Sequence, residues 1–290
     1  MTDTRYGAGD SGPGDVMPGP SSFPASSAEG PAVDPASPAD AGVVPASPAV
    51  AASVFGARLG IAEQYAGLLA TEGVVRGLIG PRETPRLWDR HLVNCGVMAE
   101  MIPAGASVVD VGSGAGLPGL VLAIARPDLA VTLVEPLARR TSFLEEAVFV
   151  LGLDNVTVLR GRAEEVVDQL PGADVVTARA VAALDKLAGW CLPLAAVGGR
   201  LLAMKGSSAA EEIAEHAAAV EALGGGAAEI RLCGDGLIDP PTTVVEIVKE
   251  RHVLPGRQRG GSGAARGASR SSRSAGTGNR GGGRGRSRRG

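Results

Sequence analysis

The stretch DVGSGAGLPG, residues 110–119, decides the fold because two glycine patterns overlap within it. Gly112, Gly114 and Gly116 form G-x-G-x-G, whereas the last two of these and Gly119 form G-x-G-x-x-G. An apolar run precedes the stretch and a helical pattern follows it, so it is expected to join a strand to a helix. Such a loop offers free N–H groups at the positive end of a helix, and glycines allow close approach of a ligand. The first pattern is typical of pockets for S-adenosylmethionine and the second of pockets for a dinucleotide.

Short apolar runs alternate with helical segments from Pro103 onward. Seven strands and five intervening helices predict an open α/β sheet, mostly parallel, with helices on both faces. The last two strands are joined by DGLIDPP, which is too short for a crossover helix, so the last strand should run antiparallel. An all-parallel dinucleotide fold would not end in this way. The expected strands are SVVDVG, AVTLVEP, NVTVLRG, ADVVTARA, GRLLAMKG, AEIRLCG and TTVVEIVKE, with helices at about 118–126, 137–151, 162–170, 181–196 and 207–223.

Two helices are expected before the sheet. VFGARLGIAEQYAGLLATEG places apolar residues at helical spacing and predicts an amphipathic helix that ends near Gly73. Thr84 followed by Pro85 predicts the start of a second helix, with a cap residue and a proline in the first turn. Its apolar face would carry Leu87, His91, Cys95, Met98 and Ile102.

Composition divides the chain into three parts. Residues 1–50 are rich in Pro, Ala and Ser, and residues 255–290 are rich in Gly, Arg and Ser, so both are expected to be disordered. Residues 51–254 are expected to form one folded domain, with N-terminal helices at 51–103 and a core that carries the glycine loop at 104–250. Residues 51–250 carry 25 acidic and 16 basic side chains, whereas 251–290 carry 11 arginines and no acid.

Three widely spaced cysteines and three histidines give neither a disulfide framework nor a metal-binding pattern, so no metal is expected. No apolar run is long enough to cross a membrane, and the N-terminus has no signal-peptide pattern. We therefore expect a cytoplasmic protein that does not bind membranes. Nothing in the pattern suggests an extra apolar face, so a monomer is expected.

Acidic side chains favour one glycine pattern over the other. Asp110, at the end of the first strand, would repel a pyrophosphate but suits the cationic amino group of S-adenosylmethionine. Glu135, at the end of the next strand, can accept hydrogen bonds from both ribose hydroxyls of an adenosine, which also suits NAD. A nicotinamide oxidoreductase therefore remains an alternative, against which Asp110 and the lack of a hydride-transfer acid or base both count.

Two later strands also end in candidate residues. Ala163 and Glu164, after the third strand, would lie over the adenine edge, although Glu164 and Glu165 equally fit ordinary acids in a helix first turn. Arg179, at the end of the fourth strand, would point into the cleft where open α/β sheets bind ligands. A structural arginine paired with a surface acid is the alternative.

Six segments together resemble a known family: RETPRLWDRHLVNC, VVDVGSGAGLPGLVLAIARPD, VTLVEPLARRTSFLEE, GRAEEV, VTARAVAALDKL and AMKG. In this order, over about residues 55–250, they resemble the bacterial RsmG family, also called glucose-inhibited division protein B. The resemblance implies a class I methyltransferase that uses S-adenosylmethionine to methylate N7 of a guanine in the decoding-region loop of 16S rRNA, guanine 527 in the conventional RNA numbering. It implies cofactor contacts from Gly112, Leu117, Ala163, Glu164 and Arg179. Glu135 follows from the class I pattern, and Asp110 and Gly114 complete the predicted cofactor site.

Guanine N7 carries a lone pair and no proton, so its methylation needs no general base. The sequence accordingly shows no convincing catalytic residue, and catalysis is expected to come from alignment and exclusion of water. Trp88 is a stacking candidate, although an aromatic residue on an amphipathic helix is more often part of the core. A noncatalytic RNA-binding protein with a retained fold is a second alternative. Binding of 16S rRNA or the small ribosomal subunit requires cations, and the candidates are Arg82, Arg86, Arg90, Arg139, Arg140 and Lys205.

Overall fold

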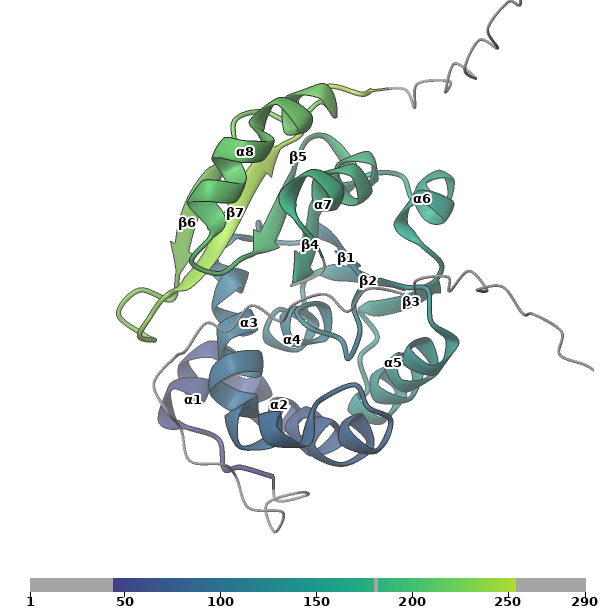
Figure 1. Ribbon diagram of the computed structural model, residues 1–290. Coiled ribbons are helices and arrows are strands. Elements are labelled where there is room, and N and C mark those ends of the chain that lie inside the picture. Colours follow the sequence, from purple (N-terminus) through teal and green to yellow (C-terminus); the bar gives the residue numbers. More distant parts are fainter. Residues whose placement is uncertain (1–43, 180–181, 254–290) are drawn as a thin grey trace, which may run out of the picture.

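The centre of the protein is a seven-stranded sheet in the order β3-β2-β1-β4-β5-β7-β6 (Figure 1). The structure is a computed structural model that describes residues 44–179 and 182–253. Strands β1 to β5 pair in parallel, and β7 runs antiparallel to both of its neighbours. The predicted fold class, with an antiparallel last strand, is confirmed. The strands are β1 Ser107–Val111, β2 Ala130–Glu135, β3 Val156–Arg160, β4 Ala173–Arg179, β5 Ala195–Met204, β6 Glu229–Cys233 and β7 Thr242–Val248.

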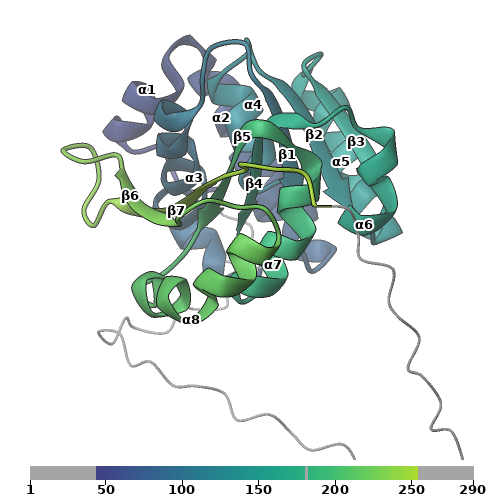
Figure 2. The same cartoon turned by 90° about the horizontal axis from the view of Figure 1, so that it is seen from above.

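Helices cover both faces of the sheet, as Figure 2 shows from above. Successive strand residues alternate between two hydrophobic clusters: Val108 and Leu133 belong to one, and Val109 and Val134 to the other. Burial on both faces is what a mostly parallel sheet requires. One face packs against the N-terminal helices, α4 Gly119–Ala125 and α5 Ala138–Leu151. The other face packs against α6 Ala163–Val166, α7 Leu184–Cys191 and α8 Ala209–Ala222. Short 3-10 turns follow α6, at Val167–Gln169, and α7, at Leu192–Leu194.

The N-terminal helical layer differs in detail from its prediction. The expected continuous helix from Val54 is broken at Gly56, whose φ of 50° is in the left-handed region. Two helices result, α1 Ala49–Phe55 and α2 Leu59–Leu68, joined by a 3-10 turn Gly56–Arg58 and followed by a π-helical segment Leu69–Gly73.

The second predicted helix begins earlier than expected. Thr84 does not cap it, because a 3-10 segment Pro81–Arg86 begins after Gly80 and encloses Thr84, which is fully buried. The chain then continues as a π-helical segment Leu87–Val93, α3 Asn94–Gly96 and a 3-10 segment Val97–Met101. The five residues expected on its apolar face are all buried.

The fold extends slightly beyond the expected N-terminal boundary. α1 begins at Ala49, and the Trp88 indole N–H donates to the carbonyl of Pro45 over 2.9 Å. Trp88 is 3% exposed and packs edge-on against Phe55, so it belongs to the core and cannot stack on a base. The predictions of disorder concern mainly residues 1–43 and 254–290, which lie outside the described residues. No helix in the described ranges is long and apolar enough to cross a membrane.

Candidate cofactor and substrate site

The glycine loop connects β1 to α4 at the carboxyl end of the sheet. Gly112, Gly114 and Gly116 have φ values of 70°, 59° and 96°, all in the left-handed region. Gly119 is instead the first residue of α4. The loop conformation therefore depends on the G-x-G-x-G pattern, because left-handed φ values favour glycine at those three positions.

Gly119 serves close packing rather than loop conformation. A Cβ atom at this position would lie 2.4 Å from Cδ2 of Leu133 and 2.7 Å from Oδ2 of Asp110. The N–H of Gly119 donates to the same Oδ2 over 3.1 Å. The Asp110 carboxylate thus lies beneath the loop and fixes the start of α4, whereas the sequence suggested an open position beside a ligand. Its other oxygen, Oδ1, is buried and makes no hydrogen bond within the described part of the chain.

Burial raises the pKa of Asp110 to about 7, against an ordinary value of 3.8. Hydrogen bonds from Ser113 and Gly119 oppose this effect, and the charge of Glu135 adds to it. The carboxyl group is therefore incompletely ionised near neutral pH. This weakens the electrostatic argument against a pyrophosphate, and the sheet topology becomes the stronger reason to reject a dinucleotide fold.

The raised pKa predicts a pH-dependent penalty on stability. Between about pH 4 and 7 the carboxyl group ionises in the unfolded chain but not in the folded protein, so the free energy of unfolding falls as pH rises. Asp110→Asn keeps an acceptor for Gly119 but cannot ionise. The free energy of unfolding of the variant, relative to that of the wild type, should therefore increase as pH rises through this window, by at most about 1.4 kcal/mol per pH unit. Urea unfolding of both proteins at several pH values measures the difference, and a difference that does not change with pH would contradict the prediction.

Glu135, at the end of β2, is 1% exposed and also supports the loop. Its Oε2 accepts from the N–H of Gly114 over 3.0 Å, and its Oε1 accepts from the N–H of Leu137 over 3.0 Å. Oε2 also lies 3.5 Å from the Arg140 guanidinium. A carboxylate oxygen has two acceptor sites, so Oε1 keeps one for a further donor such as a hydroxyl.

A cavity of about 300 Å³ adjoins the loop at the carboxyl ends of β1, β2 and β3. Gly112, Ala163, Glu164 and Trp190 all line it. The two neighbouring acids have different roles: Glu165 accepts from the N–H of Arg162 over 3.0 Å and caps α6, which leaves Glu164 to face the cavity. Glu165 is thus the capping acid, and Glu164 stays the predicted ligand residue.

Trp190 is the residue of this cavity that the sequence did not reveal. It lies on α7, whereas the other lining residues lie at the carboxyl ends of β1 and β2, in the loops that follow β1, β2 and β3, or at the start of α6. Its place depends on the packing of α7 against α6, since both belong to the same hydrophobic cluster. No local sequence pattern encodes that contact.

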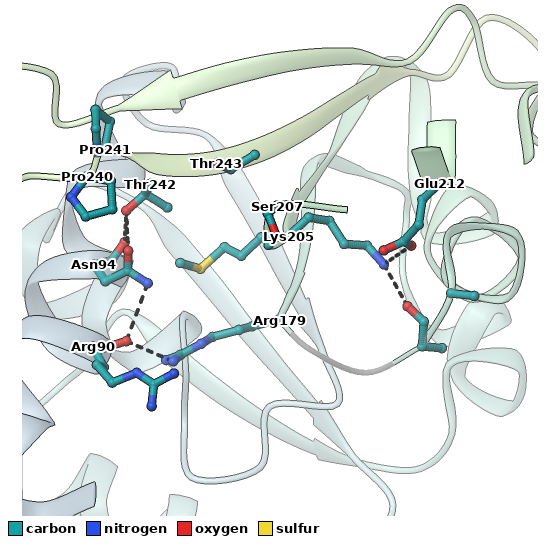
Figure 3. A pocket seen from close by; sticks show the side chains of 14 residues that line it. Arg90, Asn94, Arg179, Lys205, Ser207, Glu212, Pro240, Pro241, Thr242 and Thr243 are labelled. Atoms are coloured by element: carbon teal, nitrogen blue, oxygen red, sulfur yellow. Dashed lines mark hydrogen bonds and ion pairs between the residues drawn. The ribbon is translucent and has the colours of Figure 1, made fainter. Parts of the chain in front are cut away.

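Arg179, the last residue of β4, lies at a second and larger cleft of about 1060 Å³, shown in Figure 3. Its guanidinium donates to the carbonyl of Arg90 over 2.8 Å and to Sγ of Cys95 over 3.3 Å. Both partners belong to the N-terminal helices, so Arg179 connects the sheet to that layer. Two of its five N–H donors are used in this way, and the others make no hydrogen bond to the described residues. Asn94 and Thr242, which are hydrogen-bonded to each other, also line this cleft, and the Asn94 side chain donates to the same Arg90 carbonyl over 3.4 Å.

A third cleft of about 670 Å³ shares Arg90, Asn94 and Arg179 with the second and adds Arg86. Nearby, Nε2 of His91 lies 3.0 Å from Glu83. Burial first, and then the charge of Arg179, lower the pKa of His91 to about 4, so this contact is a hydrogen bond of a neutral imidazole. At neutral pH His91 is therefore uncharged, and the positive charge that lines this cleft belongs to Arg86, Arg90 and Arg179.

Two of the six predicted RNA-binding cations pair with acidic side chains. The ammonium of Lys205 binds Glu212 and the carbonyl of Ala182, each over 2.7 Å, and its side chain is 9% exposed (Figure 3). Arg140 turns toward Glu135, at 3.5 Å. Lys205 nevertheless lines the large cleft and the Arg140 side chain is 38% exposed, so both stay predicted RNA-binding candidates. Of the other four candidates, Arg86 and Arg90 line the clefts, and Arg82 and Arg139 are exposed elsewhere on the surface.

The strand order with an antiparallel β7, the glycine loop after β1 and the acidic residue that ends β2 define a class I methyltransferase fold. Among solved structures, precorrin-6y C5,15-methyltransferase from Geobacter metallireducens is similar with a TM-score of 0.42 and 16% identity, over 59% of this chain and 90% of that one.

Sequence comparison identifies the family. The model of GidB, rRNA small subunit methyltransferase G, matches residues 58–238. Ribosomal RNA small subunit methyltransferase G of Salinispora tropica is 66% identical over 216 residues, which cover 72% of this chain and 89% of that protein. The protein of the same name from Rhodococcus jostii is 62% identical over 213 residues, covering 73% and 92%. The chain therefore belongs to the rRNA small subunit methyltransferase G family, as its motifs predicted, and the oxidoreductase alternative is set aside.

Proposed function

We propose that this protein transfers a methyl group from S-adenosylmethionine to N7 of a guanine in the decoding-region loop of 16S rRNA, guanine 527. The observation that carries the proposal is the arrangement of two cavities at the carboxyl edge of one sheet. A small cavity adjoins the glycine loop, and a larger cleft with positive charge begins at Arg179. Ligands of open α/β sheets bind at this edge. Family membership supports ribosomal RNA as the substrate.

The residues of the small cavity fit an adenosine. Glu164 and the apolar surface of Ala163 and Trp190 would hold the adenine. Glu135, between the cavity-lining Val134 and Pro136, would take a ribose hydroxyl at the acceptor site that remains on Oε1. Gly112, Gly114 and Leu117 would line the path of the rest of the cofactor along the loop. Arg179 would act where cofactor and RNA meet, while Asp110 would act from beneath by holding Gly119. In the cytoplasm, the exposed Arg86 and Arg90 would guide RNA into the larger clefts.

Bound S-adenosylmethionine supplies an electrophilic methyl group, which guanine N7 can accept without losing a proton. The task of the protein is therefore to align the two reactants and to exclude water. The half-buried clefts at Arg179, with walls from the N-terminal helices and from the loop before β7, suit that task.

The decisive experiment is transfer of labelled methyl groups from S-adenosylmethionine to small ribosomal subunits that lack the modification. Nuclease digestion and mass analysis of nucleosides should then give label as 7-methylguanosine from one loop of 16S rRNA. Label in another nucleoside would overturn the guanine-N7 assignment. RNA binding without any transfer, with cofactor binding retained, would instead indicate a noncatalytic RNA-binding protein.

Trp190 should report cofactor binding by its fluorescence. The chain has two tryptophans, and Trp88 is buried in the N-terminal layer away from the small cavity. Titration with S-adenosylmethionine or its demethylated product should change the emission of the wild type and of Trp88→Phe, but not that of Trp190→Phe. Trp190→Ala should raise the Kd about tenfold, because an aromatic wall of the cavity is lost. A response that persists in Trp190→Phe would place the adenosine elsewhere.

A further inference from the structure

The N-terminal helical layer reaches the glycine loop through one side chain. Tyr65 lies on α2 and is completely buried. Its hydroxyl donates to the carbonyl of Ala115 over 2.6 Å, in the middle of the loop. The two residues are 50 positions apart in sequence, so the bond joins the N-terminal layer to the cofactor-binding core.

The loop is shaped to receive this hydroxyl. A Cβ atom at Gly116 would lie 2.9 Å from Oη of Tyr65 and 2.5 Å from Cδ1 of Leu120. Gly116 therefore has two reasons to be glycine: its φ of 96° and the approach of the tyrosine. Burial raises the pKa of Tyr65 well above its ordinary value of 10.0, so the hydroxyl keeps its proton and remains a donor.

Three side chains thus hold successive parts of the loop. Glu135 accepts from Gly114, Tyr65 donates to Ala115, and Asp110 accepts from Gly119. The two carboxylates come from strands of the sheet. Tyr65 comes from the segment before the sheet, to which the sequence assigned no part of the cofactor site.

We infer that Tyr65 is a positioning residue for the cofactor, and that α2 is thereby part of the cofactor-binding apparatus. A loop whose middle carbonyl is fixed presents its N–H groups and its left-handed glycines in one arrangement before the ligand arrives. Preorganisation of this kind improves affinity because less conformational freedom is lost on binding. The inference rests on the proposed binding of S-adenosylmethionine at this loop.

The variant Tyr65→Phe tests the inference, because it removes the hydroxyl and keeps the ring that fills the core. The buried carbonyl of Ala115 then loses its donor. We expect the Kd for S-adenosylmethionine, measured by titration calorimetry, to rise about tenfold. At saturating cofactor, kcat and the KM for the ribosomal subunit should stay within about twofold of the wild type, since the loop still closes around bound cofactor.

Ser107→Ala is the matched control. Ser107 lies at the opposite end of β1. Its hydroxyl donates to the Asp174 carboxylate over 2.7 Å and accepts from the Asp174 N–H over 3.0 Å, so the control also removes hydroxyl hydrogen bonds from the fold. Its Kd for the cofactor should equal that of the wild type. Hydrogen exchange measured by mass spectrometry should quicken at residues 112–118 in Tyr65→Phe and not in Ser107→Ala.

The outcomes separate this inference from the proposed function. If the wild type itself does not bind S-adenosylmethionine, the proposed function fails. If the wild type binds and Tyr65→Phe binds equally well, the positioning role is wrong. A parallel loss of cofactor affinity, RNA affinity and kcat, with uniformly faster exchange, would overturn it in favour of a purely structural role.

Discussion

Arg179→Ala is expected to lower kcat/KM for methyl transfer by about 100- to 1,000-fold, the usual effect of removing a preorganised cation or donor from a reaction centre. The side chain lines both larger clefts and is held by Arg90 and Cys95. Its loss removes charge from the point where cofactor and RNA would meet, and removes the hydrogen bonds to the Arg90 carbonyl and to Sγ of Cys95. Methyl transfer to small subunits, measured at several concentrations of each substrate, gives kcat/KM.

Arg179→Lys should also be impaired, by about tenfold or more, because one ammonium cannot replace a planar guanidinium with separate partners. Arg231→Ala is the control: Arg231 is half-exposed on β6 and pairs with Glu229 and Glu246 away from the clefts. It should keep the activity of the wild type. Activity of Arg179→Ala within threefold of the wild type would show that Arg179 has a structural role only.

Gly119→Ala should lose both stability and cofactor binding. The added methyl group would lie 2.4 Å from Leu133 and 2.7 Å from the Asp110 carboxylate, within a core that cannot make room without moving β1 or α4. Overpacking of this kind costs about 1–3 kcal/mol. The loop would shift with the start of α4, so the Kd for S-adenosylmethionine should rise at least tenfold. Urea unfolding and calorimetric titration measure the two effects.

Gly60→Ala is the matched control, since Gly60 is also helical and a Cβ there meets no atom within 4 Å. It should leave cofactor binding unchanged and stabilise the protein by about 0.5–1 kcal/mol, because alanine favours helix more than glycine does. If Gly119→Ala behaved in the same way, the close packing beneath the loop would have no consequence for the site.

The sequence was most informative where local pattern and function coincide. Strand and helix positions followed from alternating apolar runs, and the antiparallel β7 followed from a connection too short for a helix. The N-terminal segment was predicted less well. A helical period alone does not reveal that Gly56 takes a left-handed φ, nor that Pro81 starts a 3-10 segment before Thr84. These outcomes depend on how the helices pack against the sheet.

The sequence by itself determined the class of fold, the family and the loop that would bind the cofactor, because glycine positions and the succession of strands and helices along the chain are local properties. Only the tertiary structure decided which side chains are available. It placed Asp110 beneath the loop, bound Lys205 and Arg140 to acidic partners, and brought Trp190 and Tyr65 to the site from α7 and α2. The physical reason is that burial and pairing depend on contacts between residues distant in sequence, and these set both the pKa of a carboxyl group and the freedom of a cation to bind a ligand.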